Sequence, residues 1–208
     1  MKLSGSKGEL RLQKKYKTEK RASAFYKNQM LDFLNPSMRD FIARMEIVFI
    51  STADSNGECD CSIRSGLPGF IQVINKKKLA YPEYKGNGVL ASLGNIEENS
   101  HIGLLFVDFL KSTIGLHVNG RAKIIENKNI ISDPDLSKVF KNDLKITGGR
   151  KPELWVFIEV EEAYIHCSKH IPLMEKRNKK IHWGTDDHVL KKGDFFKPRN
   201  KPSSSPKK

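Results

Sequence analysis

The feature that most constrains the fold is a series of short apolar runs between residues 46 and 167, each bounded by Gly, Pro, Asn or Asp. Runs of this kind, rich in Val, Ile, Phe and Tyr, are typical of β-strands. Short turns join most of them, so we expect an antiparallel barrel of six or seven strands with peripheral helices. The predicted strands cover residues 46–53, 58–65, 70–74, 79–81, 101–109, 114–126 and 153–167.

Apolar residues at helical spacing predict the helices that surround this barrel. Pro36 is expected to end the first helix, and Ser37 to cap the second. Asp133 and Pro134 are a typical helix start and precede the last one. The predicted helices cover residues 22–34, 37–45, 89–99 and 136–144.

The net charge of +13 is confined to the two ends of the chain. Residues 1–24 carry eight basic and two acidic side chains, residues 175–208 carry eleven and four, and residues 25–174 carry 18 of each sign. We therefore divide the chain into a basic N-terminal extension (1–24), one folded domain (25–174) and a basic C-terminal tail (175–208). The two ends are expected to be solvated and partly disordered, and nucleic-acid binding by the neutral domain is not expected.

Apolar runs and cysteine usage indicate a cytoplasmic protein. No run approaches the roughly 18 residues that a membrane span needs, and no apolar signal-peptide core is present. Three cysteines are an odd, sparse set, which favours reduced thiols.

Five Cys and His side chains offer an alternative, a zinc site. They form a CxC pair and an HCxxH group, but the CxxC spacing usual for zinc is missing, so we predict no metal. The residues are Cys59, Cys61, His166, Cys167 and His170.

Two loops have the composition of a phosphate-binding site. They read SIRSGLPGF and YPEYKGNGVLASLGNI, and each combines Gly, Ser or Asn with one cation. The second loop runs into a predicted helix, whose N-terminus favours an anion. Strand alternation places Ser62 and Arg64 on one face and Ser65 on the other, and Arg64 can alternatively pair with Asp60. The candidate phosphate ligands are Ser62, Arg64, Ser65, Lys85, Gly86, Asn87, Ser92 and Asn95.

Together with the segments FISTADSNGECDCSIRSGLPGF, GLLFVDF, LHVNGRA and AYIHCSKH, these loops resemble the pyridoxamine 5'-phosphate oxidase-like flavoproteins. The resemblance spans about residues 40–172 and is strongest to their predicted flavin-nucleotide-binding branch. It implies a split β-barrel, a homodimer, and FMN bound where the two subunits meet.

The flavin ring needs flat apolar walls and backbone donors, and the turn at residues 66–69, which includes Gly69, can supply the donors. The resemblance implies that Tyr81-Pro82 lies along the flavin. It also implies, more weakly, that Leu116, His117 and Asn119 reach the ring from the partner subunit. The candidate walls are Phe70, Tyr81, Pro82 and Tyr84.

We predict an FMN-binding oxidoreductase of unknown substrate, with the flavin supplying the redox chemistry. The C-terminal segment carries His182 and Trp183 but lacks the arginine-bearing ending that holds pyridoxal in the true oxidases, so pyridoxamine phosphate is not the expected substrate. Two alternatives remain open: a non-catalytic flavin-binding dimer for sensing or storage, and a polyanion binder that uses the basic ends. Related split barrels are also implied to accept haem or F420.

Overall fold

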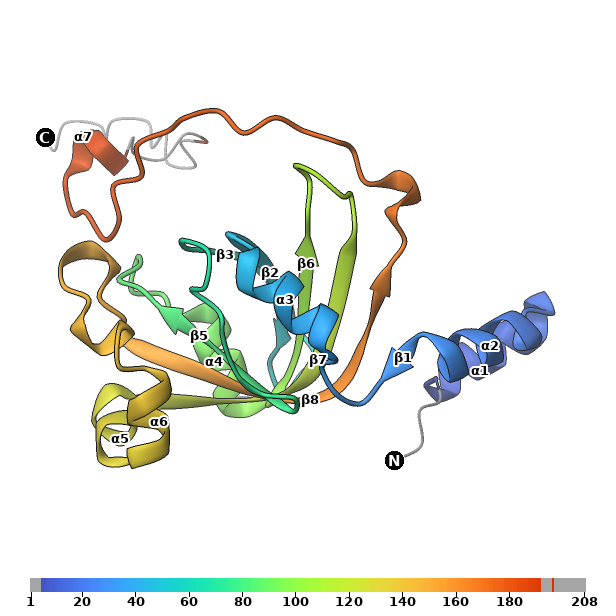
Figure 1. Cartoon of the computed structure of the whole chain (residues 1–208). Helices are drawn as coiled ribbons and strands as arrows, with labels where there is room; N and C mark the ends of the chain where they lie inside the picture. The colour runs from blue at the N-terminus through green and yellow to red at the C-terminus, as the bar shows by residue number, and fades with distance from the viewer. Residues whose placement is uncertain (1–4, 192–195, 197–208) are drawn as a thin grey trace, which may run out of the picture.

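The computed structural model describes residues 5–191 and Phe196, and its centre is one antiparallel sheet that curls around a core (Figure 1). The strand order is β3-β2-β6-β7-β8-β5-β4, and β1 pairs separately with β8. The strands are β1 (Met30–Leu31), β2 (Ile47–Ala53), β3 (Cys59–Ser65), β4 (Gln72–Asn75), β5 (Lys78–Glu83), β6 (His101–Val107), β7 (Gly115–Glu126) and β8 (Leu154–His166).

The predicted mainly antiparallel fold with peripheral helices is confirmed, and β2 to β8 correspond to the seven predicted strands. The sheet is not closed by hydrogen bonds, because β3 and β4 stand at the two ends of the strand order. The long strand β8 pairs along its length with β7, β5 and β1. It therefore joins the two halves of the split barrel.

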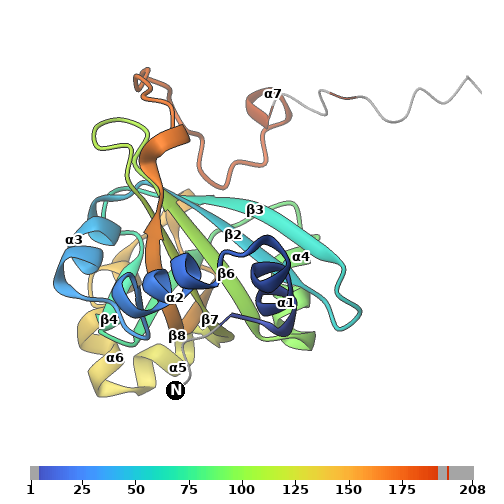
Figure 2. The ribbon, with the colours of Figure 1, turned by 90° about the vertical axis from the view of Figure 1, so that its right-hand side faces the viewer.

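Seven α-helices lie around the sheet in the described part of the chain (Figures 1 and 2). The first two form a hairpin that projects from the body beyond β1 (Figure 1). The helices are α1 (Lys7–Tyr16), α2 (Glu19–Asn28), α3 (Pro36–Arg44), α4 (Ala91–Glu98), α5 (Asn127–Ser132), α6 (Pro134–Val139) and α7 (His188–Lys191).

The prediction of one helix over residues 22–34 is wrong at its C-terminal end. Helix α2 stops at Asn28, and Met30–Leu31 pairs with Ala163 and Tyr164 of β8. Pairing and the burial of Met30 outweigh the helical spacing of these residues.

The helix over residues 37–45 is confirmed, but its cap is not Ser37. The side chain of Asn35 accepts a hydrogen bond from the Met38 amide at 2.9 Å, and Pro36 is the first helical residue.

The helix predicted over residues 136–144 is shorter and starts earlier. Asp133 caps α6, as expected, and the stretch beyond it continues only as a 3₁₀ turn at Asp143–Lys145. Helix α5, which precedes it, was not predicted.

The basic N-terminal extension includes α1, which begins with a capping box between Ser6 and Glu9. Residues 1–4, 192–195 and 197–208 lie outside the described residues, so the expected disorder there stays a prediction.

The core has two parts, one on each face of the β5–β8 region. The larger lies inside the curled sheet, where α3 and α4 contribute buried residues such as Ile42 and Ile96. In the smaller, the rings of Phe140 and Trp155 meet edge to face at a centroid distance of 4.6 Å. No helix of the described residues is long and apolar enough to cross a membrane.

Candidate functional site

A cavity of about 510 Å³ lies between β3, the loop after β5 and the start of α4. The structure thus brings together the two loops that the sequence analysis singled out. Eight of the thirteen predicted site residues line this cavity: Ser62, Arg64, Ser65, Tyr84, Lys85, Gly86, Asn87 and Ser92.

The other five predicted site residues do not line it. Phe70 and Tyr81 are buried in the core, and Pro82 is a buried residue of β5. Gly69 occupies a turn with φ +86°, and the Asn95 amide donates to Thr52 Oγ1 at 3.1 Å.

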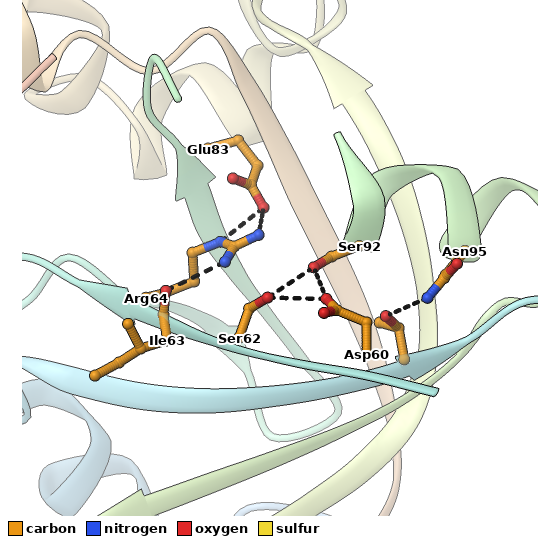
Figure 3. Close-up of polar contacts among 8 residues, drawn as sticks. Asp60, Ser62, Ile63, Arg64, Glu83, Ser92 and Asn95 are labelled. Carbon is orange, nitrogen blue, oxygen red and sulfur yellow. Dashed lines mark hydrogen bonds and ion pairs between the residues drawn. The ribbon is translucent and has the colours of Figure 1, made fainter. Parts of the chain in front are cut away.

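Local structure explains which side chains enter the cavity. Because alternate residues of a strand share a face, Asp60, Ser62 and Arg64 lie on the same side of β3. Asp60 and Ser62 point toward Ser92 of α4, while Arg64 points toward Glu83 of β5 (Figure 3). The loop enters α4 through Leu90, whose φ of +57° is uncommon for a residue with a side chain. This entry places Ser92, in the first turn of α4, opposite Ser62.

Asp60 lies at the centre of the polar cluster (Figure 3). Its Oδ2 accepts hydrogen bonds from Ser62 Oγ and Ser92 Oγ, each at 2.8 Å. These hydroxyls, Ser92 first and then Ser62, lower the pKa of Asp60 below its ordinary value. Asp60 therefore connects β3 to α4 as a carboxylate.

Arg64 pairs with Glu83 and not with Asp60. Its Nε and Nη2 donate to Glu83 Oε1 at 2.9 and 2.7 Å, and the two side chains are 21% and 14% exposed. Burial raises the pKa of Glu83, although Arg64 opposes the shift. The buried Tyr81 ring lies 5.9 Å from the guanidinium, and its hydroxyl has no hydrogen-bond partner among the described residues.

Carboxylates accept hydrogen bonds from the donor groups of this cavity. Three acidic side chains line it (Asp60, Glu83 and Glu153) against two basic ones, Arg64 and Lys85. Lys85 also forms an ion pair with Asp186 of the C-terminal segment, which raises the pKa of the lysine. The donor types suit an anion, but an anion must compete with these carboxylates for them.

The C-terminal segment supplies a wall of the cavity that the sequence analysis did not predict. The ring of Trp183 meets that of Tyr84 edge to face at 5.7 Å, and both line the cavity together with Leu93 and Leu154. Glu83 also lines the cavity and was not predicted. The strand alternation that selected Ser62 and Arg64 also points to Asp60, whereas Trp183 was noted only through the comparison of the C-terminal segment with that of the true oxidases.

The side chains assigned by resemblance to the partner's flavin contact lie elsewhere, along β7. His117 Nε2 is 2.8 Å from His166 Nδ1, and the His117 ring stacks on Tyr164 at 4.7 Å. Burial and the neighbouring imidazole lower the pKa of His117. Asn119 donates to Glu162 at 3.2 Å, while Leu116 is buried.

No group of three or more His, Cys, Asp or Glu side chains within the described residues is arranged to hold a metal ion. The zinc alternative therefore has no preformed site in this part of the chain.

Comparison with known proteins identifies a family. The model of the family described as "Pyridoxamine 5'-phosphate oxidase" matches residues 34–167, more than half of the chain. No curated protein sequence matches.

Several solved structures are similar in part. HupZ from Group A Streptococcus is 21% identical, with 63% of this chain and 92% of that chain covered and a TM-score of 0.46. HutZ from Vibrio cholerae, described as a heme storage protein, is 14% identical, with 64% and 94% covered and a TM-score of 0.45. General Stress Protein 26 from Bacillus anthracis is 17% identical, with 61% and 88% covered and a TM-score of 0.42.

The hydroxyl contacts of Asp60 predict a pH-dependent effect of Ser92→Ala. Loss of this donor should raise the pKa of Asp60 toward its ordinary value of 3.8. A lowered carboxyl pKa stabilises the fold above the ordinary pKa, and this contribution is lost as the pH falls. Carboxyl NMR titration should show the higher pKa, and the destabilisation by Ser92→Ala should shrink below about pH 4.

Ser51→Ala is the control, because Ser51 is exposed and its side chain makes no hydrogen bond with the described residues. Equal titration of Asp60 in the wild type and in Ser92→Ala would contradict the assigned contact.

Proposed function

The chain belongs to the pyridoxamine 5'-phosphate oxidase family, and on that premise we propose that it binds FMN in the cavity between β3 and α4. One observation carries the proposal: two serine hydroxyls, a guanidinium and the first turn of a helix meet in that cavity. Charge-assisted donors of this kind suit a phosphate.

The donors fit a phosphate if they exchange partners. Ser62 and Ser92 can turn their hydroxyls from Asp60 to a phosphate oxygen, since a hydroxyl rotates freely about its bond. Arg64 uses Nε and Nη2 for Glu83, while its Nη1 contacts only the Ile63 carbonyl, at 3.2 Å. Nη1 can therefore bind the phosphate without breaking the ion pair.

The size and walls of the cavity suit the rest of the cofactor. About 510 Å³ lies within the range of small-molecule sites. Tyr84 and Trp183 offer aromatic surface, and Leu93 and Leu154 offer apolar surface. Bound flavin would supply the hydride chemistry of an oxidoreductase, while these side chains hold and orient the ring. The substrate stays unassigned.

We also propose that a second copy of the chain covers the open side of the site. Three apolar side chains that line the cavity are largely exposed: Ile63 (54%), Val89 (70%) and Leu90 (58%). An exposed apolar rim beside a polar cavity is typical of an interaction surface. A homodimer would bury this rim and enclose the cofactor.

A non-catalytic flavin-binding role is the second candidate, and the pairing within the cavity favours it. Asp60, Arg64, Glu83 and Lys85 are all engaged in hydrogen bonds or ion pairs with other residues. With these contacts in place, none of the four stands unpaired as an acid or base for proton transfer.

Arg64→Ala tests the proposed site. The variant should bind FMN about 10- to 150-fold more weakly, because one charge-assisted hydrogen bond contributes about 1.5–3 kcal/mol. Riboflavin, which has no phosphate, should bind as it does to the wild type. Titration calorimetry with both ligands measures the difference.

Two controls accompany this measurement. Arg121→Ala removes an arginine that is also paired, with Glu161, but lies outside the cavity. The double variant Arg64→Ala/Glu83→Gln avoids a buried, unpaired carboxylate. An equal loss of FMN and riboflavin in the double variant would assign Arg64 a structural role.

Reduction of bound flavin distinguishes the two candidate functions. For an oxidoreductase, NADH or NADPH should bleach the flavin absorbance of the loaded protein, and air or an acceptor should restore it. Dithionite serves as the control for accessible flavin. Bleaching by dithionite alone would favour the non-catalytic role.

Ile63→Asp tests the dimer. A charge at the apolar rim should shift the protein toward the monomer in sedimentation velocity and weaken both FMN and riboflavin. Ile131→Asp is the matched control, because Ile131 is 62% exposed on α5 and does not line the cavity. A wild-type monomer that binds FMN tightly would contradict the shared site.

A further inference from the structure

The chain after β8 crosses the molecule from the end of that strand to α7 on the other side (Figure 1). Its first part is attached near β6 and β2. The Met174 amide donates to the Phe109 carbonyl at 2.7 Å, and Lys176 pairs with Glu46, also at 2.7 Å. We call residues 171–191 the crossing segment.

The second part of the crossing segment packs beside the candidate flavin site. Trp183 contacts Tyr84, and Asp186 pairs with Lys85. The backbones also approach closely, since a Cβ atom on Gly149 would overlap the Trp183 carbonyl oxygen. The segment is thus attached to the body at both parts and is not simply a solvated tail.

A second cavity, of about 700 Å³, lies between the crossing segment and the loop after β5. It shares Lys85, Gly86, Asn87 and Gly184 with the first cavity, so the two cavities are neighbours. A ligand in one cavity would therefore lie close to a ligand in the other.

The charge of the second cavity is opposite to that of the first. Four lysines line it (Lys85, Lys179, Lys180 and Lys191), and Asp186 is the one carboxylate among its described lining residues. Asp186 pairs with both Lys85 and Lys191. The side chains of Lys179 and Lys180 make no ion pair or hydrogen bond with any of residues 5–191.

The remaining walls are partly apolar, because Ile181, Val189 and Leu190 also line the cavity. Two ammonium groups with no ion-pair partner among residues 5–191, beside apolar side chains, match an organic molecule that carries a phosphate. A lysine run on an open surface is commonly only solvated, but these lysines border a cavity whose segment is fixed by the contacts above.

We propose that this second cavity binds the phosphate or diphosphate group of a second small organic ligand, next to the ligand of the first cavity. Three of the four lysines belong to the crossing segment, so anion binding in the second cavity does not depend on flavin in the first. In a flavoprotein, the second ligand would be an electron donor or a substrate that carries this group.

Inorganic pyrophosphate is the probe, measured by titration calorimetry at fixed ionic strength with the full chain. Lys179→Ala and Lys180→Ala should each weaken binding about fivefold, the effect of one unit charge at about 4 Å in water. Lys76→Ala is the matched control, since Lys76 is exposed and lies outside both cavities. Asp186→Asn should bind pyrophosphate more tightly, because it removes the one carboxylate found among the described residues that line the cavity.

Other outcomes overturn the proposal. If Lys179→Ala and Lys180→Ala bind like Lys76→Ala, or the wild type does not bind pyrophosphate, the lysines are only solvated. If oligonucleotides bind through these lysines while pyrophosphate does not, the surface is a polyanion surface.

The first cavity is tested separately. If FMN and pyrophosphate bind in different cavities, pyrophosphate still binds to Arg64→Ala and to wild-type protein saturated with FMN. FMN can instead place its own phosphate in the second cavity. In that case FMN displaces pyrophosphate, riboflavin does not, and FMN binds Lys180→Ala more weakly than the wild type; this result would exclude a second ligand there. Failure of FMN binding alone would overturn the proposed function and leave the second cavity intact.

Discussion

The Asp60 carboxylate, which holds the hydroxyls of Ser62 and Ser92, is the interaction on which the candidate site depends. It joins the edge strand β3 to the first turn of α4, two elements that are far apart in the sequence. Hydrogen bonds to a charged acceptor are stronger than neutral ones. These hydrogen bonds fix the shape of the cavity, but they also use the hydroxyl donors that a phosphate would need. Asp60 and a bound phosphate would therefore compete for the same two hydroxyl groups.

This competition explains why composition alone describes the site poorly. Gly, Ser, Arg and Lys in two loops predict an anion site, yet carboxylates face those donors in the folded chain. The second cavity has the reverse balance, and two of its four lysines, Lys179 and Lys180, have no ion-pair partner among residues 5–191. An anionic ligand would therefore meet repulsion near Asp60 and Glu83 and attraction under the crossing segment.

Patterns within a single element predicted the structure well, and contacts between distant elements did not follow from them. Alternation on β3 correctly placed Ser62 and Arg64 on one face, and seven strand positions followed from apolar runs. The Arg64–Glu83 pair depends on how the edge strand β3 approaches β5, which is next to the last strand at the other end of the sheet order. Trp183 enters the site only because the crossing segment returns to it. Met30–Leu31 likewise became a strand because β8 offered a free edge.

Lys85 connects the two cavities, since it lines both and pairs with Asp186. An anion that binds Lys85 from either side competes with Asp186 for the ammonium group. The Trp183–Tyr84 contact and the close approach at Gly149 do not involve this charge, so the crossing segment keeps part of its attachment when the ion pair breaks. A ligand that weakens the Lys85–Asp186 pair from one cavity therefore changes the affinity of the other cavity for an anion. By thermodynamic linkage, the anion in the second cavity changes the affinity for the first ligand by the same factor. One lysine can therefore couple the two sites without a large conformational change.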